Sequence, residues 1–170
     1  MNLVLYAVPF FILAIVFELA FGVIRKRNTF RLNDSISSLF LGVLSQARRF
    51  VTLGVGGYVY YLITQYFSLP VLESGSVLTW VVAFVLYDFC YYWLHRMGHE
   101  RTILLAAHVA HHQSEDYNLT TALRQNSNGF LLVLIFYIPM YLLGIQAELV
   151  VTVGSLNLIY KFWVHTEHVP

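Results

Sequence analysis

Residues 77–112 read VLTWVVAFVLYDFCYYWLHRMGHERTILLAAHVAHH and combine two features that decide the fold. The first half, Val77–Leu94, is almost entirely apolar and carries one charge, Asp88. It has the length of a membrane-spanning helix, which needs about 17–25 mostly apolar residues. The second half carries five histidines within 18 residues. The stretch therefore predicts an apolar helix that leads into a group of histidines.

The whole chain is as poor in charge as this stretch. Of its 170 residues, 58% are hydrophobic and 11% are charged, whereas a soluble domain carries about 25% charged residues. This composition excludes an ordinary soluble enzyme and a disordered linker, and the single Cys90 cannot form an internal disulfide. The net charge of +1 leaves no basic surface for nucleic acid. We therefore expect an integral membrane protein that does not bind nucleic acid.

The apolar runs predict an all-α, multi-pass membrane protein with about four to five transmembrane helices. The runs are Leu3–Ile24, Phe50–Phe67, Val77–Leu94, Phe130–Ile145 and Leu149–Val164. We expect the last two to form a hairpin that turns near Gly144–Glu148. The segment Ile36–Ala47 is too short to span and is expected to be interfacial or re-entrant. Gly54, Gly56 and Gly57 in the second run would allow close helix packing.

The positive charges predict the orientation of these spans. Six of the ten lysines and arginines follow the first span, three follow the third, and Lys161 lies at the end of the fifth. All ten then fall on one side, which the positive-inside rule makes cytoplasmic, with the N-terminus outside. All seven histidines fall on that same side, at or just past span ends. We expect a bacterial inner membrane or the endoplasmic reticulum.

The spacing of the histidines predicts a metal site. His95 and His99 share one helix face, and His108, His111 and His112 share another. Imidazole suits zinc, copper, iron and nickel, and a closed zinc site usually has four ligands, often with cysteine. More than four histidines and no nearby cysteine favour two metal ions, and two irons could activate dioxygen against the C–H bonds of a lipid. The spacing of His165 and His168 leaves open whether they are ligands.

Asp88 is a candidate catalytic residue that would support the metal site. It lies seven residues before His95, two helical turns earlier on the same face and about 10 Å deeper. An ionisable group at such depth is a functional candidate. Its carboxylate could accept the second N–H of a ligating imidazole, either that of His95 or another. The alternative is a buried aspartate bonded to a tyrosine or to the backbone.

These residues resemble the membrane-bound fatty acid hydroxylase and sterol desaturase superfamily, whose signature is three histidine boxes. The first two boxes resemble His95-Arg96-Met97-Gly98-His99 and His108-Val109-Ala110-His111-His112. Residues 113–125, QSEDYNLTTALRQ, and residues 162–167, FWVHTE, are similar to the alkylglycerol monooxygenase branch. In that branch the equivalent of His165 is a ligand.

The resemblance implies a dinuclear iron centre at the cytoplasmic face and O2-dependent hydroxylation or desaturation of a lipid. In the alkylglycerol branch, hydroxylation of the ether-linked carbon yields an aldehyde and glycerol. The reductant would be tetrahydrobiopterin or an electron-transfer protein. The implied ligands of the two iron ions are His95, His99, His108, His111, His112 and His165. Glu115, Asn118 and Arg124 are candidates for orienting ligands or the substrate head group, although Arg124 could equally be a positive-inside anchor.

One departure concerns the third box, a His-x-x-His-His about twenty residues after His165, which has no counterpart before Pro170. We therefore expect one hydroxylase-type domain, 1–170, that is C-terminally incomplete. It would comprise membrane helices (1–94), the histidine-box region (95–127), and a hairpin with the start of a cytoplasmic region (128–170). The alternatives are an inactive fragment of such an oxidase and a metal-binding membrane protein or transporter. A transporter should hold its ligands near the bilayer midplane, whereas these histidines gather at one surface.

Overall fold

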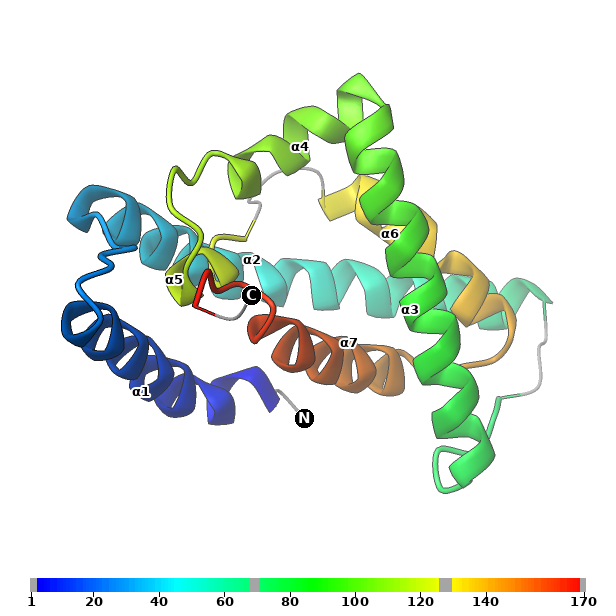
Figure 1. Ribbon diagram of the computed structural model, residues 1–170. Coiled ribbons are helices and arrows are strands. Elements are labelled where there is room, and N and C mark those ends of the chain that lie inside the picture. The colour runs from blue at the N-terminus through cyan, green and yellow to red at the C-terminus, as the bar shows by residue number, and fades with distance from the viewer. Residues whose placement is uncertain (1–2, 68–70, 126–129, 169–170) are drawn as a thin grey trace.

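The computed structural model describes residues 3–67, 71–125 and 130–168, and these residues form helices and connecting turns without a strand (Figure 1). The helices are α1 (Leu3–Ile24), α2 (Leu32–Phe67), α3 (Val77–Glu100), α4 (Thr102–His112), α5 (Leu119–Ala122), α6 (Phe130–Leu142) and α7 (Ala147–Phe162). The all-α prediction is confirmed for the described part of the chain.

Helix α2 differs from the sequence prediction. It is one continuous helix of 36 residues, where we expected a short segment, Ile36–Ala47, and a separate span, Phe50–Phe67. The connecting residues 46–49 read Gln-Ala-Arg-Arg, and all four are good helix formers. Because neither proline nor glycine separates the two parts, the backbone hydrogen-bond pattern continues through them.

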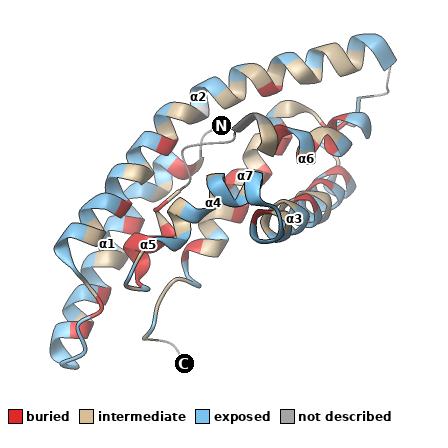
Figure 2. Ribbon diagram, turned by 90° about the horizontal axis from the view of Figure 1, so that it is seen from above, coloured by how far each residue is buried: buried red, intermediate tan, exposed pale blue. Residues whose placement is uncertain are grey.

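Helices α1 and α3 are the two described helices that are long and apolar enough to cross a membrane. Only 17% of the most apolar stretch of each helix is buried inside the fold. Most of α1 and α3 is coloured as exposed in Figure 2. Large apolar surfaces of this kind mark contact with another apolar phase. Helices α6 and α7, with 13 and 16 residues, are shorter than a full span. By length and composition, two of the expected membrane spans are therefore found, as α1 and α3.

Two buried apolar clusters hold the helices together. One joins α3, α6 and α7, and its buried members are Ala83, Cys90, Tyr137, Met140, Tyr141, Ile145, Leu149, Val150 and Val153. The other joins α1, α5 and the end of α7, where the rings of Phe11 and Phe162 stack with their centroids 4.3 Å apart. Helix α7 belongs to both clusters, so it connects the N-terminal helix to α3.

The turn predicted between the last two apolar runs is present at Gly144, but the hairpin is not: the described residues of α6 and α7 make few contacts with each other, and both helices pack on α3 instead. Gly144 adopts a φ of 76°, its N–H donates to the Tyr141 carbonyl (3.0 Å), and the Ile145 N–H donates to the Met140 carbonyl (3.1 Å). These two bonds form the Schellman motif, in which glycine tolerates the left-handed conformation that ends a helix.

The close packing expected at the three glycines of α2 occurs at one of them. A Cβ atom at Gly56 would lie 3.3 Å from the Tyr141 hydroxyl of α6, whereas Gly54 and Gly57 have no such neighbour within 4 Å in the described part of the fold.

One buried carboxylate connects three distant segments. The side chain of Glu18 in α1 is 5% exposed. One of its oxygens accepts a hydrogen bond from the backbone N–H of Leu119, at the start of α5 (2.8 Å), and the other accepts from the hydroxyl of Thr166. Glu18 therefore ties α1 both to α5 and to the segment that follows α7.

We expect Glu18→Ala to lower the free energy of unfolding by about 2–3 kcal/mol, because hydrogen bonds to a buried charged group are lost. Thermal unfolding of the purified chain in mild detergent would then have a midpoint several degrees lower. Glu73, an exposed carboxylate, provides the matched control, and Glu73→Ala should leave the midpoint nearly unchanged. Equal midpoints for the two variants would contradict this role of Glu18.

Candidate metal centre

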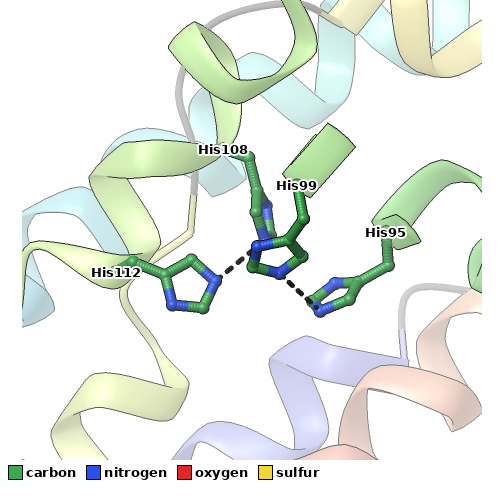
Figure 3. A group of neighbouring side chains, drawn as sticks. All are labelled: His95, His99, His108 and His112. Carbon is green, nitrogen blue, oxygen red and sulfur yellow. Dashed lines mark hydrogen bonds between the residues drawn. The ribbon is translucent and has the colours of Figure 1, made fainter. Parts of the chain in front are cut away.

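Four imidazoles from two helices converge on one point (Figure 3). His95 and His99 lie one turn apart on α3, and His108 and His112 lie one turn apart on α4. One ring nitrogen from each of the four lies within 4.8 Å of the others. The Nε2 atoms of His95 and His99 are 3.3 Å apart, and those of His108 and His112 are 3.0 Å apart. Four nitrogen donors at these separations could surround a metal ion.

The corner between α3 and α4 makes this convergence possible. Arg101 leaves the helical conformation, with φ −121° and ψ 122°, so the chain turns and α4 packs back against α3. Gly98 faces the returning helix, and a Cβ atom there would lie 3.3 Å from Cγ of His108. The absence of a side chain at Gly98 thus lets the His108 ring lie directly against α3.

His111 and His165 form a neighbouring pair. Nδ1 of His111 lies 2.7 Å from the Arg124 carbonyl, and Nδ1 of His165 lies 3.0 Å from the Lys161 carbonyl. A carbonyl only accepts, so each Nδ1 is the donor and each neutral ring keeps its lone pair on Nε2. The two Nε2 atoms are 3.4 Å apart. Histidines that bind metals are commonly oriented in this way.

The pair adjoins the four-histidine cluster. The ring centroid of His111 lies 5.9 Å from that of His108 and 5.3 Å from that of His112. The six predicted ligand histidines therefore form one continuous group. His168 lies elsewhere, with its ring against Phe21 and its Nε2 3.5 Å from the Thr29 hydroxyl.

Burial favours the neutral form of these rings. It lowers the pKa of His108 to about 4, with the neighbouring imidazoles adding to the effect. Burial likewise lowers the pKa of His112 and of His165. A metal ion binds only the deprotonated ring nitrogen, so the site favours the form of histidine that ligation needs.

A cavity of about 730 Å³ adjoins the histidines. Its wall includes five of the six histidines, several tyrosines and aliphatic side chains, and two cationic residues, Arg48 and Lys161. This volume lies within the range of small-molecule sites, about 300–1,000 Å³. The cavity could therefore admit part of a lipid to the histidine group.

The partners of Asp88 lie on α7. One of its oxygens accepts from the amide of Asn157 (3.0 Å) and lies 3.4 Å from Nζ of Lys161. Lys161 in turn lies over the ring of Tyr91, 3.2 Å from its centroid, and Tyr91 stacks on His95. In the described structure Asp88 thus connects α3 to the end of α7, just before His165, and reaches His95 only through intervening side chains.

Arg124 is buried within the protein rather than free to meet a head group. Its side chain is 8% exposed, its Nε donates to the Ala110 carbonyl (2.7 Å), and its Nη1 donates to Asp34 (2.9 Å). Its own carbonyl accepts from His111. Arg124 therefore connects α2, the end of α4 and a ligand histidine.

The other two candidate head-group residues also have protein partners. Asn118 is buried and caps α5, accepting from the Thr120 N–H (3.0 Å) and donating to the Thr29 carbonyl. Glu115 is exposed and forms an ion pair with Arg31. In this structure Asn118 supports the fold around the site.

Sequence reasoning did not single out Asp34 or Tyr117. Asp34 resembles an ordinary acidic residue in the first turn of a helix, and only the fold brings it to Arg124. Tyr117 donates to the Val164 carbonyl (2.9 Å), and its ring centroid lies 5.4 Å from that of His165. It thereby fixes the segment that carries this histidine.

A group of converging imidazoles on apolar helices fits the class of helical proteins with a histidine-rich metal site. The chain belongs to the fatty acid hydroxylase family, whose model matches residues 80–170. This confirms the resemblance drawn from the histidine boxes.

Within this family, the chain is similar to several alkylglycerol monooxygenases. The chain is 40% identical over 164 residues to alkylglycerol monooxygenase of Homo sapiens, 38% over 161 residues to that of Xenopus tropicalis, and 39% over 162 residues to that of Danio rerio. Each match covers 95% of this chain and 36% of the relative, so the chain spans about a third of the length of these proteins. No solved structure matches the chain.

We expect Arg124→Met to lower the free energy of unfolding by about 3 kcal/mol, because the partly buried carboxylate of Asp34 loses its cation. It should also weaken metal retention by about 10- to 100-fold, since the carbonyl that orients His111 is no longer anchored. Thermal unfolding and metal titration would measure the two effects.

Arg31→Met is the matched control, because that arginine is 60% exposed and also pairs with carboxylates. It should cost less than about 1 kcal/mol and leave metal retention unchanged. A normal metal affinity in Arg124→Met would contradict the positioning role of Arg124.

Proposed function

We propose that this chain forms the metal-binding part of a membrane-bound lipid monooxygenase. The observation that carries the proposal is the convergence of four imidazoles from α3 and α4 beside the His111–His165 pair. Six nitrogen donors are more than the four ligands that one closed zinc site usually has. Membership of the fatty acid hydroxylase family supports oxidation of a lipid.

We propose that the six histidines hold two iron ions. His95, His99, His108 and His112 would form the larger part of the ligand set, and His111 and His165 would complete it. Bound iron would supply the activation of O2 that attack on an unactivated C–H bond requires. Arg124 would keep His111 in its tautomer and orientation, and Asp88 would hold α7, which carries His165 at its end.

The substrate class follows from the relatives. Their name, alkylglycerol monooxygenase, makes a glyceryl ether lipid the proposed substrate. A monooxygenase inserts one oxygen atom of O2 and reduces the other to water with two electrons. The activity therefore needs a reductant, for which tetrahydrobiopterin or an electron-transfer protein is the proposed donor.

We propose that the protein is a multi-pass membrane protein, with α1 and α3 among its spans and the histidines on the cytoplasmic side. The lysines and arginines on the predicted cytoplasmic side support this orientation. Arg27 and Arg31 pair with Glu167 and Asp116, so the connection after α1 lies beside the segments that follow α7 and α4. The His95 and His99 positions in the last turns of α3 do not suit a transporter, which binds its ion near the bilayer midplane.

The test is the metal content and the product of the purified chain in mild detergent, reconstituted with Fe²⁺. We expect about two iron ions per chain. We also expect aldehyde release from 1-O-hexadecylglycerol when O2 and tetrahydrobiopterin are supplied. The double variant His108→Ala/His111→Ala should lose both metal and product, because each part of the ligand set loses one donor.

The matched control is His168→Ala, which removes a histidine that lies outside the group and should retain the metal. Iron well below one per chain in the unaltered protein would contradict the proposed dinuclear site. Iron retained without any aldehyde would contradict the proposed substrate or reductant while leaving the metal site intact.

A further inference from the structure

One cation in the cavity wall has two buried nitrogens without a hydrogen-bond partner among the described residues. Nε and Nη1 of Arg48 are buried and form no hydrogen bond there. The same side chain lines the cavity that contains the histidines. The other cation in that wall, Lys161, lies 3.4 Å from an oxygen of Asp88. Among the described residues, Arg48 therefore has no carboxylate partner.

Such an arrangement is unusual because it is costly to bury donors of a charged group without partners, even in a half-buried side chain. Burial lowers the pKa of Arg48, yet an arginine stays protonated in proteins. A buried donor without a partner in a native protein calls for an explanation, and a bound ion or ligand is a common one. Arg48 takes no part in the proposed metal centre, so that site does not explain it.

The helix holds Arg48 firmly at this place. Ser45, one turn earlier on α2, is buried, and its hydroxyl donates to the Gly42 carbonyl. A Cβ atom at Gly42 would lie 2.9 Å from the Leu123 carbonyl, so α2 approaches the segment after α5 closely here. Asp34 and Ser38 on the same helix bind Arg124. The guanidinium thus belongs to a packed helix rather than to a free loop.

The charge pattern of the cavity suits an anion. None of the described residues that line it is Asp or Glu. Apart from the two cations and the five histidines, the wall is aromatic and aliphatic, with a few neutral polar groups such as Gln125 and Ser114. A ligand that satisfies Arg48 therefore combines an oxyanion with an apolar portion.

We propose that Arg48 binds the oxyanion, of the phosphate class, at the polar end of the lipid substrate. The guanidinium offers a planar fork of donors that matches phosphate oxygens. The apolar part of the lipid lies along the aromatic and aliphatic wall, toward the histidines. This inference rests on the proposed function and deepens it: the protein prefers ether lipids with an anionic head group to neutral ones of the same chain length.

The test compares three probes on the purified chain in mild detergent: 1-O-hexadecylglycerol, its 3-phosphate, and inorganic phosphate. Binding is measured by titration calorimetry and by the thermal unfolding midpoint. We expect the phosphate-bearing lipid to bind about 10- to 100-fold more tightly than the neutral one, the gain typical of charge-assisted hydrogen bonds. Arg48→Gln should bind both lipids alike, at the affinity of the neutral lipid.

Arg25→Gln is the matched control, because Arg25 is exposed and lies outside the cavity wall; it should keep the preference. Equal binding of the two lipids by the unaltered chain, or a preference kept by Arg48→Gln, would overturn the proposal. Inorganic phosphate that binds as tightly as the lipid phosphate would overturn it too, since the site would then recognise free phosphate.

A second variant keeps the proposal testable if the glutamine variant folds poorly. Arg48→Met removes the unpaired charge and retains an apolar stem, so it should raise the midpoint of the ligand-free chain and abolish the shift caused by the lipid phosphate. A lowered midpoint together with an undiminished shift would overturn the proposal. Because these readouts need no iron and no turnover, they are independent of the tests of the metal site and of the reaction.

Discussion

The contact between Gly98 and His108 is the constraint on which the site depends. It lets α4 fold back against α3, so that the histidines of two separate helices face one another rather than line two unrelated surfaces. A helix presents residues four apart on one face, but it cannot surround a metal ion by itself. Because the chain turns at Arg101, the histidines of α3 and those of α4 come together in one group.

Polar links, two of them buried and that of Asp88 exposed, support the site from a distance. Arg124 anchors His111, Glu18 joins α1 to the segment after α7, and Asp88 holds α7 close to α3. In an apolar chain each buried charge needs a partner, because an unpaired one is costly. These pairs therefore fix how the helices lie around the histidines, while the two apolar clusters supply most of the packing.

The sequence predicts the helical class, the turn at Gly144 and the histidine faces, because these follow from local periodicity and turn chemistry. It did not predict the continuity of α2, where arginines within good helix formers resembled a boundary. The sequence also did not predict the roles of Arg124 and Arg48. The Arg124–Asp34 bond joins residues 90 positions apart, and an unpaired guanidinium is recognised only once its surroundings are known.

Iron K-edge X-ray absorption of the reconstituted protein would show whether imidazole nitrogens of this chain hold iron. We expect an inner shell of nitrogen and oxygen, outer-shell scattering from several imidazoles per iron, and loss of that scattering in His108→Ala/His111→Ala. Iron surrounded by water oxygens alone, or a spectrum that these substitutions leave unchanged, would contradict the proposed metal site.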